Sequence, residues 1–441
     1  MKRIYSIIQC LFLAGTLLAQ GNQNRSKNGN DSKEVLVNEI KTLNLIDCYD
    51  LAKQNFPLIK EKELIKKTRE FTVENASKGH WPQITFTGQA TYQSEVTSLP
   101  IKLPGVTVPS LNKDQYRVVG EVTQTLYDGG MVNQQKKMQE ASADVQDQNL
   151  EVQLYSLKDR INQLFFGTLL VDEQLKQNEL LQKNIKNNIE KLQAGMDNGT
   201  VMKSNVLEME AELITREQSR IEIRSGRKAF LDMLSLFING KLGESTGLLK
   251  PPGTNEMSDS IKRPELAMFL VQKKNYDIQD EILNANKRPK VQLFFQEGFG
   301  RPSLNMLDNS FNFYSIGGIR FNWTLSGLYT LQNDRQLLAV NRQNTDVQQE
   351  LFLFNTKMAL RQQGNDIQKY REMISKDNEI IQRRTEVRIA ANAQLENGTI
   401  SSHEYLGQLI AEDQARQNLI LHQMQLLMKQ YDYQNTLGTN N

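Results

Sequence analysis

Residues 81–92 read WPQITFTGQATY, and from Gln83 to Tyr92 polar and apolar side chains alternate at every position. Gln and Thr occupy the odd-numbered positions, whereas Ile, Phe, Gly, Ala and Tyr occupy the even-numbered ones. A period of two predicts a β-strand with one polar and one apolar face. The surrounding sequence is rich in Gln, Lys, Glu and Leu, which favour long helices. The chain is therefore expected to combine two-faced strands with a mainly helical body.

The context of this stretch occurs twice in the chain. Pro57 and Pro82 are matched by Pro264 and Pro289 at one common offset, and the sequence around each pair is similar. Further on, NGTVMKSNVL at 198–207 is answered by NGTISSHEYL at 397–406. The order of the matching segments is kept, and their offset drifts only slightly. This pattern indicates a duplication of roughly 200 residues.

The sequence predicts the same order of elements in each half of the chain. A helical stretch that ends before a proline comes first, at 45–79 and again at 264–288. Two alternating strands follow in each half, joined by connections rich in Pro, Gly, Ser and Asn. The predicted strands are 83–92 and 116–126 in the first half and 290–299 and 311–323 in the second.

A long helical hairpin completes each half. Proline-free helical sequence runs over 131–197 and 331–396, and a second helix returns over 203–237 and 403–433. Apolar residues recur there at three- and four-residue intervals, which is typical of a coiled-coil seam. About 65 helical residues would extend roughly 100 Å. Both hairpins turn at Asn-Gly-Thr, where Gly can adopt the left-handed helix cap.

The predicted domain organisation follows from these repeats. The first repeat covers 43–239 and the second covers 261–437, with a linker at 240–260. At the N-terminus, two basic residues, an apolar run and small residues predict a signal peptide at 1–19. The polar, low-complexity segment at 20–42 is expected to be disordered.

Composition excludes several classes of function. Removal of Lys2 and Arg3 with the signal peptide lowers the formal net charge from +2 to zero, which leaves no basic field for nucleic acid. Cys48 is the only cysteine after that segment, so no internal disulfide can form. No nucleophile–base constellation and no metal-ligand spacing is present, so we expect no enzyme activity, cofactor or metal. The three histidines are His80, His403 and His422.

The strand pattern leaves two interpretations open. One is a small antiparallel sheet that packs on a helix and exposes one face to solvent. The other is a membrane wall, because a tilted transmembrane strand needs about 9–11 residues and the polar helices offer no compact body to cover the sheet. Four strands cannot close a barrel, for which about eight are needed, and lipid does not tolerate open sheet edges. Strands that span a membrane would therefore have to belong to a barrel shared by several chains.

Taken together, these motifs resemble the TolC family of outer-membrane efflux and secretion channels. The resemblance covers about residues 43–437 and rests on the duplication, on LYDGG at 126–130 and its degenerate partner WTLSGLY at 323–329, and on the two Asn-Gly-Thr turns. It implies a mainly α fold with a four-stranded antiparallel β contribution. Duplicated coiled-coil hairpins would cross the periplasm, and the strands would belong to a 12-stranded β-barrel shared by a homotrimer.

The resemblance also implies a function and partners. The trimer would lie in outer-membrane lipid and conduct solutes passively from the periplasm to the exterior. The tip turns would contact a periplasmic adaptor (membrane fusion) protein, and through it an inner-membrane RND or ABC pump. The turn residues are Asn198, Gly199, Thr200, Asn397, Gly398 and Thr399. Alternatives are an exported coiled-coil structural or adhesion protein, or the exit duct of a type I protein secretion system.

Candidate site residues come from the same resemblance. Glu404 and Asn205 occupy positions that form the entrance gate in the family, whereas Ile400 replaces the usual gating Arg. The alternative for Glu404 is an early-helix carboxylate stabilised by the helix dipole. On the polar strand faces, charged side chains are expected to line the lumen, or else to pair on the face of a soluble sheet. They are Arg117, Glu121 and Arg320.

Overall fold

The computed structural model describes residues 41–97, 111–254, 260–305 and 308–439. These residues belong to one compact unit, Glu39–Asn441. The predicted signal peptide and the predicted lead-in up to residue 40 lie outside the described residues. The described part is mainly helical and contains one four-stranded antiparallel sheet, so this prediction of the fold class is confirmed.

The first repeat begins with two helices, continues with two strands and ends with a helical hairpin. Its first helix ends before Pro57, and Phe56 is extended with φ −62° and ψ 133°, as the residue before a proline prefers. The elements are α2 (Leu45–Asn55), α3 (Lys60–Ser77), β2 (Gln83–Tyr92), β3 (Asp114–Tyr127), α4 (Met131–Tyr155), α5 (Leu157–Asp197) and α6 (Lys203–Ile238).

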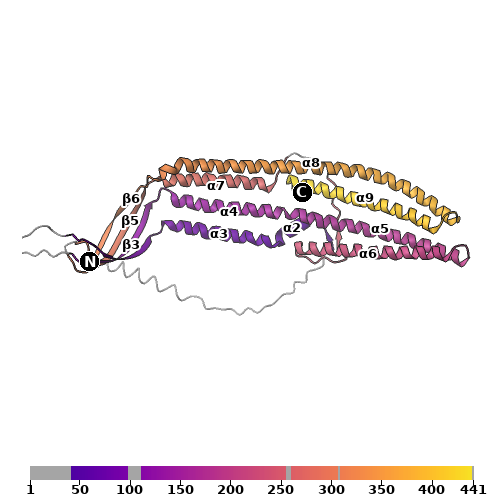
Figure 1. Ribbon diagram of the computed structural model, residues 1–441, viewed down its shortest axis with the longest axis horizontal. Helices are drawn as coiled ribbons and strands as arrows, with labels where there is room; N and C mark the ends of the chain where they lie inside the picture. Colours follow the sequence, from indigo (N-terminus) through magenta and orange to yellow (C-terminus); the bar gives the residue numbers. More distant parts are fainter. Residues whose placement is uncertain (1–40, 98–110, 255–259, 306–307, 440–441) are drawn as a thin grey trace, which may run out of the picture. The chain divides into compact units, whose positions relative to one another are not determined.

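The second repeat follows the same plan, with a single helix before its two strands (Figure 1). They are α7 (Pro264–Asn286), β5 (Lys290–Arg301), β6 (Asn312–Asn322), α8 (Gly327–Glu396) and α9 (Ser402–Leu437). Helix α8 is continuous over 70 residues. The matching helix of the first repeat is interrupted at Ser156, although the sequence predicted one continuous helix over 131–197. The Ser156 hydroxyl donates to the carbonyl of Gln153 at 2.7 Å, a local bond that competes with regular helix geometry.

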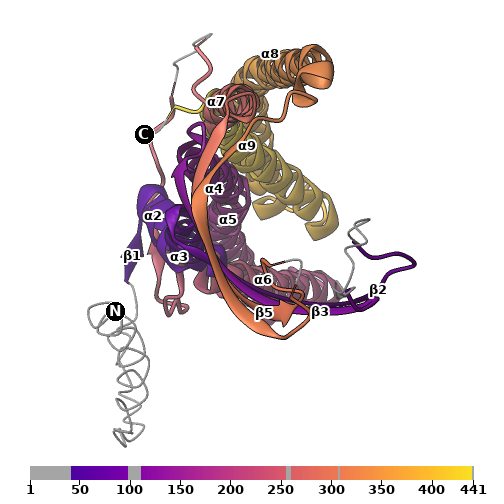
Figure 2. The same ribbon diagram turned by 90° about the vertical axis from the view of Figure 1, so that its left-hand side faces the viewer.

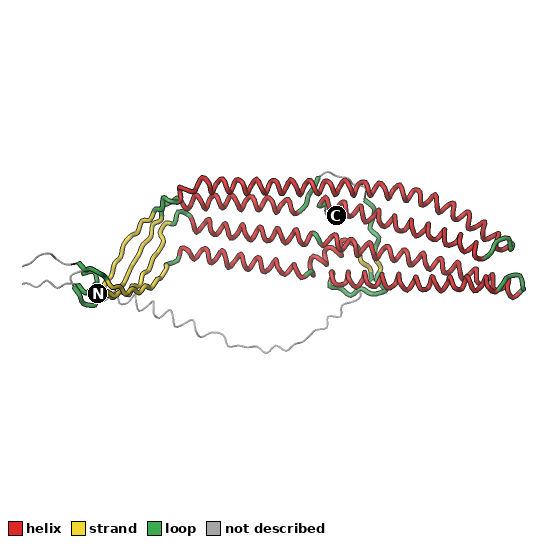
Figure 3. The backbone as a smooth tube through the Cα atoms, viewed as in Figure 1, coloured by secondary structure: helices red, strands yellow, loops and turns green. Residues whose placement is uncertain are grey.

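The four long strands form a sheet in the order β2-β3-β5-β6, and every neighbouring pair is antiparallel. The two repeats therefore meet at the β3–β5 pair. The register places Thr85 opposite Glu121, and Glu121 opposite Gln296. Strands β2 and β6 each pair on one side only within the described part of the chain. Figure 3 shows the sheet at the end of the helices opposite the two hairpin turns.

The helices lie in two rows beyond the sheet. Next to the sheet, α3, α4, α7 and α8 are successive neighbours; farther away, α6, α5, α9 and α8 follow one another. Helix α8 therefore belongs to both rows and lies at one edge, whereas α3 and α6 lie at the other edge (Figure 2). Among the described residues, none of the helices has the length and apolar content needed to cross a membrane.

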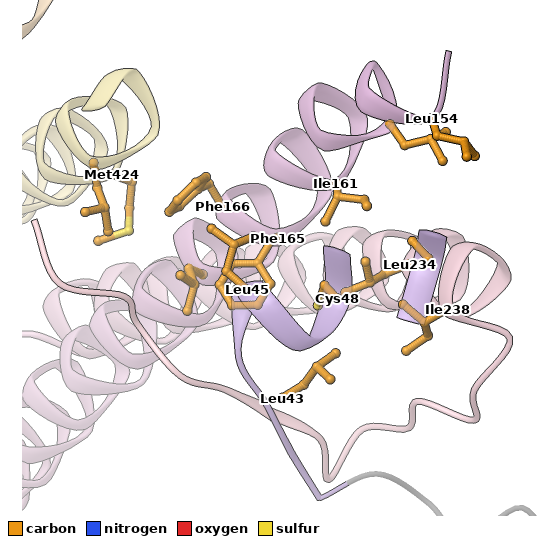
Figure 4. Packing of buried hydrophobic residues seen from close by; sticks show 14 of the residues in the cluster. Leu43, Leu45, Cys48, Leu154, Ile161, Phe165, Phe166, Leu234, Ile238 and Met424 are labelled. Atoms are coloured by element: carbon orange, nitrogen blue, oxygen red, sulfur yellow. The ribbon is translucent and has the colours of Figure 1, made fainter. Parts of the chain in front are cut away.

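The largest hydrophobic core lies where α2 packs between α5 and α6. Cys48, Phe165 and Leu234 are fully buried there, and Met424 of α9 extends the cluster (Figure 4). Burial raises the pKa of the Cys48 thiol to about 12, so this cysteine is an apolar core residue and not a reactive one. This core ties the first repeat to the last helix of the chain.

A short parallel pair of strands was not predicted from the sequence. Strand β1 (Thr42–Leu43) pairs with β4 (Gly247–Leu248). Thr42 belongs to the segment predicted to be disordered, and β4 belongs to the predicted linker. In the structure the two segments pair, and Leu43 is buried in the core next to α2. Two-residue strands are too short to produce an alternating pattern, so this contact has no signal in the sequence.

Candidate functional site

One face of the sheet is apolar and exposed. Its side chains come from the even-numbered positions of β2 and β3 and the odd-numbered positions of β5 and β6, as the register requires. Phe86 is 80% exposed and Phe313 is 84% exposed. Ile84 and Ile319 are also largely exposed. A contiguous exposed apolar face of this kind marks contact with a membrane or with another protein.

Aromatic side chains gather at the end of this face that lies far from the helices. Phe299 stacks on Phe311 with 5.6 Å between ring centroids and contacts Phe313 at 4.6 Å. Arg301 lies over the rings of Tyr116 and Phe311, at 5.6 and 5.1 Å. The Arg301 guanidinium also pairs with Asp114. Aromatic rings beside a paired charge are typical of the boundary between an apolar and an aqueous layer.

The opposite face carries the predicted lumen residues. Arg320 Nη1 lies 2.9 Å from Glu121 Oε1, and Gln296 donates a second hydrogen bond to the same carboxylate. Arg117 Nη2 donates to Gln89 Oε1 at 2.9 Å. The structure therefore places Arg117, Glu121 and Arg320 on one face and brings the last two together.

Two aromatic residues interrupt the polar face for a local reason. Tyr314 lies across Gly298, where a Cβ would come within 2.2 Å of the tyrosine ring. Phe294 lies across Gly318 in the same way, and Arg320 stacks on the Phe294 ring at 4.6 Å. Each ring lies opposite a glycine on the neighbouring strand and fills the space that a side chain would occupy. These apolar residues are therefore compatible with a polar face.

The LYDGG motif forms the junction between the sheet and the helices. The Asp128 carboxylate accepts hydrogen bonds from the backbone N–H groups of Gly130 and Val132, at 2.8 and 2.7 Å. Gly129 and Gly130 have φ values of 75° and 88°, which favour glycine. Arg288 of the second repeat donates to the Gly129 carbonyl at 3.0 Å. The motif thus begins α4 and joins the two repeats at the end of the sheet.

The two Asn-Gly-Thr turns have the same geometry. Gly199 and Gly398 have φ values of 73° and 69°, and a Cβ at either position would meet no atom within 4 Å. Asn198 and Asn397 each donate to the carbonyl four residues before, at 2.8 Å. Thr200 and Thr399 close the turns through hydrogen bonds from their hydroxyl and backbone N–H groups to the carbonyls of Gly195 and Gln394. Both turns are open surfaces at the end of the helices remote from the sheet (Figure 1).

The predicted gate residues lie just after these turns. Glu404 forms a capping box with Ser401: its carboxylate accepts from the Ser401 N–H at 2.8 Å, and its own N–H donates to Ser401 Oγ at 3.2 Å. The hydrogen bond from the Ser401 backbone lowers the pKa of Glu404. Asn205 lies in the first turn of α6, and Ile400 packs on the apolar cluster near the tip. In this chain the Glu404 carboxylate thus stabilises the start of α9.

Sequence reasoning missed the buried polar contacts within and between the hairpins. Glu412 is buried between α8 and α9 and binds Arg388 and Arg416, the latter at 2.7 Å. Burial alone would raise the pKa of Glu412, but hydrogen bonds from both arginines lower it. The adjacent Asp413 accepts from Gln177 of α5 at 2.9 Å, and burial raises its pKa. The only available signal was the acidic pair 412–413, which follows the apolar residues Leu409, Ile410 and Ala411.

Two histidines also form contacts between elements. His403 Nδ1 lies 2.7 Å from Glu208 Oε1, which joins α9 to α6 near the tip. His422 Nδ1 lies 2.6 Å from Asp377 Oδ2 between α9 and α8. Within the described ranges, no three His, Cys, Asp or Glu side chains are grouped so that they could hold a metal ion.

The sequence and the fold of this chain are both similar to those of known proteins. Residues 48–236 match the sequence model of the family described as outer membrane efflux protein. The fold of nearly the whole chain matches solved structures, including that of CusC, with a TM-score of 0.64 over 96% of this chain and 100% of that one. This family match covers most of the first repeat, and the similarity over the rest of the chain is one of fold.

Other solved structures support the same fold. VceC, an outer membrane protein from Vibrio cholerae, matches with a TM-score of 0.62 over 90% of this chain and 96% of its own. The CmeC outer membrane channel from Campylobacter jejuni matches with a TM-score of 0.61 over 95% of this chain and 94% of its own. Sequence identities are 14% for CusC and 13% for the other two, so these similarities concern the fold alone. No curated protein matches the sequence.

Proposed function

We propose that three copies of this chain form an outer-membrane channel that conducts solutes passively from the periplasm to the exterior. The observation that carries this proposal is a four-stranded sheet with one exposed apolar face, whose two edge strands each pair on one side only within the described part of the chain. In lipid, an open edge would leave backbone polar groups without partners. Pairing β6 of one copy with β2 of the next removes every edge, and three copies supply enough strands to close a barrel.

The helices support the same mode of association. Helix α8 lies at one edge of the helical layer and exposes apolar side chains at intervals of three, four or seven residues. They are Leu337, Val340, Val347, Leu351, Phe354 and Met358. The opposite edge exposes Leu64 and Phe71 on α3, and Leu207, Ile214 and Ile221 on α6. Coiled-coil spacing on both edges fits the packing of one copy against the next.

This arrangement gives the two sheet faces their roles. The apolar face, with Phe86 and Phe313, would contact outer-membrane lipid, and the polar face, with Arg117, Glu121 and Arg320, would line the lumen. Residues that alternate between lipid and water are characteristic of transmembrane barrel strands. The mechanism is passage through a water-filled path, so no reacting groups are required.

At the other end of the helices, the two open turns are the proposed contact for a periplasmic adaptor protein. Each turn exposes a glycine and is rigidified by its own hydrogen bonds, so a partner would bind a preformed surface. Energy for transport would come from an inner-membrane RND or ABC pump through that adaptor. A ring of three Glu404 side chains, with Asn205 nearby, is the proposed entrance.

Cell fractionation and reconstitution test the proposal. The full chain is expected to partition with the outer membrane, to run as a trimer in mild detergent and to conduct ions in planar bilayers. Monomeric protein recovered from the periplasm without detergent would contradict it and would favour the structural or adhesion alternative. Outer-membrane trimers whose loss blocks export of a protein, but not efflux of small solutes, would instead indicate a type I secretion duct.

A further inference from the structure

The charged side chains of the strands are divided unequally between the two faces of the sheet. The register places Asp114, Glu297 and Arg301 on the apolar face. The polar face carries Arg117, Glu121, Lys290 and Arg320. Strand β2 has no charged residue. Cations therefore outnumber carboxylates on the polar face, whereas the reverse holds on the apolar face.

Local contacts neutralise only part of the positive charge. Arg320 is balanced by Glu121 at 2.9 Å and is held against the Phe294 ring, so this pair contributes little net charge. Arg117 donates to a neutral amide oxygen, that of Gln89, and its side chain is exposed. Hydrogen bonding to Gln89 fixes the guanidinium over the face between β2 and β3 without reducing its charge.

Lys290 is the second unbalanced cation. It lies opposite Asn322 at the start of β5 and lines a cleft at the junction between the sheet and the helices. Lys287, Arg288 and Asp334 line the same cleft, so the positive charges there outnumber the single carboxylate. Neither Arg117 nor Lys290 forms an ion pair with another described residue. Each chain therefore presents two uncompensated cations on this face, one near each end of the strands.

We infer that the polar face of the sheet selects for anionic solutes such as carboxylates. This inference rests on the proposed function, because three copies would bring six such cations around one lumen. A unit charge about 10 Å away in water changes the local concentration of a monovalent ion about twofold. The effects of several charges that face one path multiply, so the six cations enrich anions and deplete cations where solutes leave the channel.

The test is ion selectivity of the reconstituted trimer, measured as the reversal potential in a KCl gradient. At about 10 mM salt the Debye length is about 30 Å, so the lumen charges act on ions well beyond contact distance. The double variant Arg117→Gln/Lys290→Gln is expected to lower the chloride-to-potassium permeability ratio at least about threefold relative to the wild type. At about 1 M salt the Debye length falls to about 3 Å and the difference should largely disappear.

Two variants control for changes in shape. Arg117→Lys keeps the charge and should keep the wild-type ratio, whereas Glu297→Gln changes a charge on the opposite face of β5 and should leave the ratio unaltered. An unchanged ratio in the double variant, or an equal shift in Glu297→Gln, would overturn the inference while leaving the channel intact. A wild-type trimer without any conductance would overturn the proposed function and this inference with it.

Discussion

Replacing Phe86 with Arg tests which face of the sheet meets lipid. Phe86 lies midway along β2, on the apolar face, and is 80% exposed in the isolated chain. Its ring covers Gly120 on β3. An arginine on the lipid-facing side of a barrel strand, at the midplane of the bilayer, costs about 2–4 kcal/mol. Since the trimer contains three copies, the loss would be roughly 6–12 kcal/mol for the assembly.

The neighbouring residue provides a matched control. Thr87 is exposed on the polar face of the same strand, so Thr87→Arg places the same side chain toward the proposed lumen. We expect little loss of stability from this change. Both variants would be expressed at equal levels, and the amount of heat-sensitive trimer in the outer-membrane fraction would be compared by semi-native electrophoresis. Chemical denaturation of the purified trimers would give the difference in stability.

Equal behaviour of the two arginine variants would refute this assignment of the lipid-facing side of the sheet. Equal loss would mean that neither face is specifically lipid-exposed. Greater loss for Thr87→Arg than for Phe86→Arg would mean that the two faces have been assigned in reverse.

Three further predictions concern the turns, the helix caps and the core. Ser401→Ala removes half of the capping box and should destabilise the start of α9 by about 1 kcal/mol, measured by hydrogen exchange of residues 402–406. The hydrogen bond from the Ser401 backbone lowers the pKa of Glu404, so the stabilisation that this carboxylate gives the cap should be complete near neutral pH and lost as the pH falls through the unfolded-state and then the folded-state pKa; protection factors, corrected for the slower intrinsic exchange in acid, that are equal at both pH values would contradict this. Gly199→Ala should cost about 1 kcal/mol because its φ of 73° is strained for alanine, whereas Gly407→Ala in α9 should be neutral or stabilising. Cys48 should react with iodoacetamide only after denaturation, because burial raises its pKa to about 12; rapid labelling of the native protein would refute its place in the core.

The strands could be predicted well where alternation was regular. Strand β2 has the bounds that the sequence predicted, because ten alternating residues follow Pro82 without interruption. In β5, Phe294 disturbs the alternation, and only the register shows that its ring covers Gly318 of β6. Period-two patterns report which face a residue occupies, but not what lies opposite it on the next strand.

The candidate site was predictable to the same degree. Parity along the strands assigned Arg117, Glu121 and Arg320 to one face, but the pairing of the last two depends on β5 lying between β3 and β6. The buried contacts of Glu412 depend on the register between α8 and α9, where residues 24 and 27 positions apart meet. Helical periodicity shows which face of a helix is apolar, but not which residues of two neighbouring helices lie side by side. Sequence reasoning therefore could not find this network.

The β1–β4 pair has a consequence for how the chain can fold. The Gly247 N–H donates to the carbonyl of Lys41 at 2.9 Å, and the Leu249 N–H donates to that of Leu43 at 3.0 Å. All of α2 to α6 lies between these strands, so the first repeat is a closed loop of chain whose two ends are joined before the second repeat begins. The second repeat is also joined at its ends, where the Lys262 N–H donates to the carbonyl of Leu437 at 2.6 Å, but it packs on the first repeat as well: β5 is paired with β3, and α7 packs on α4. In a chain translocated from its N-terminus, the first repeat can thus complete its own connections, and it then provides the surface on which the second is assembled.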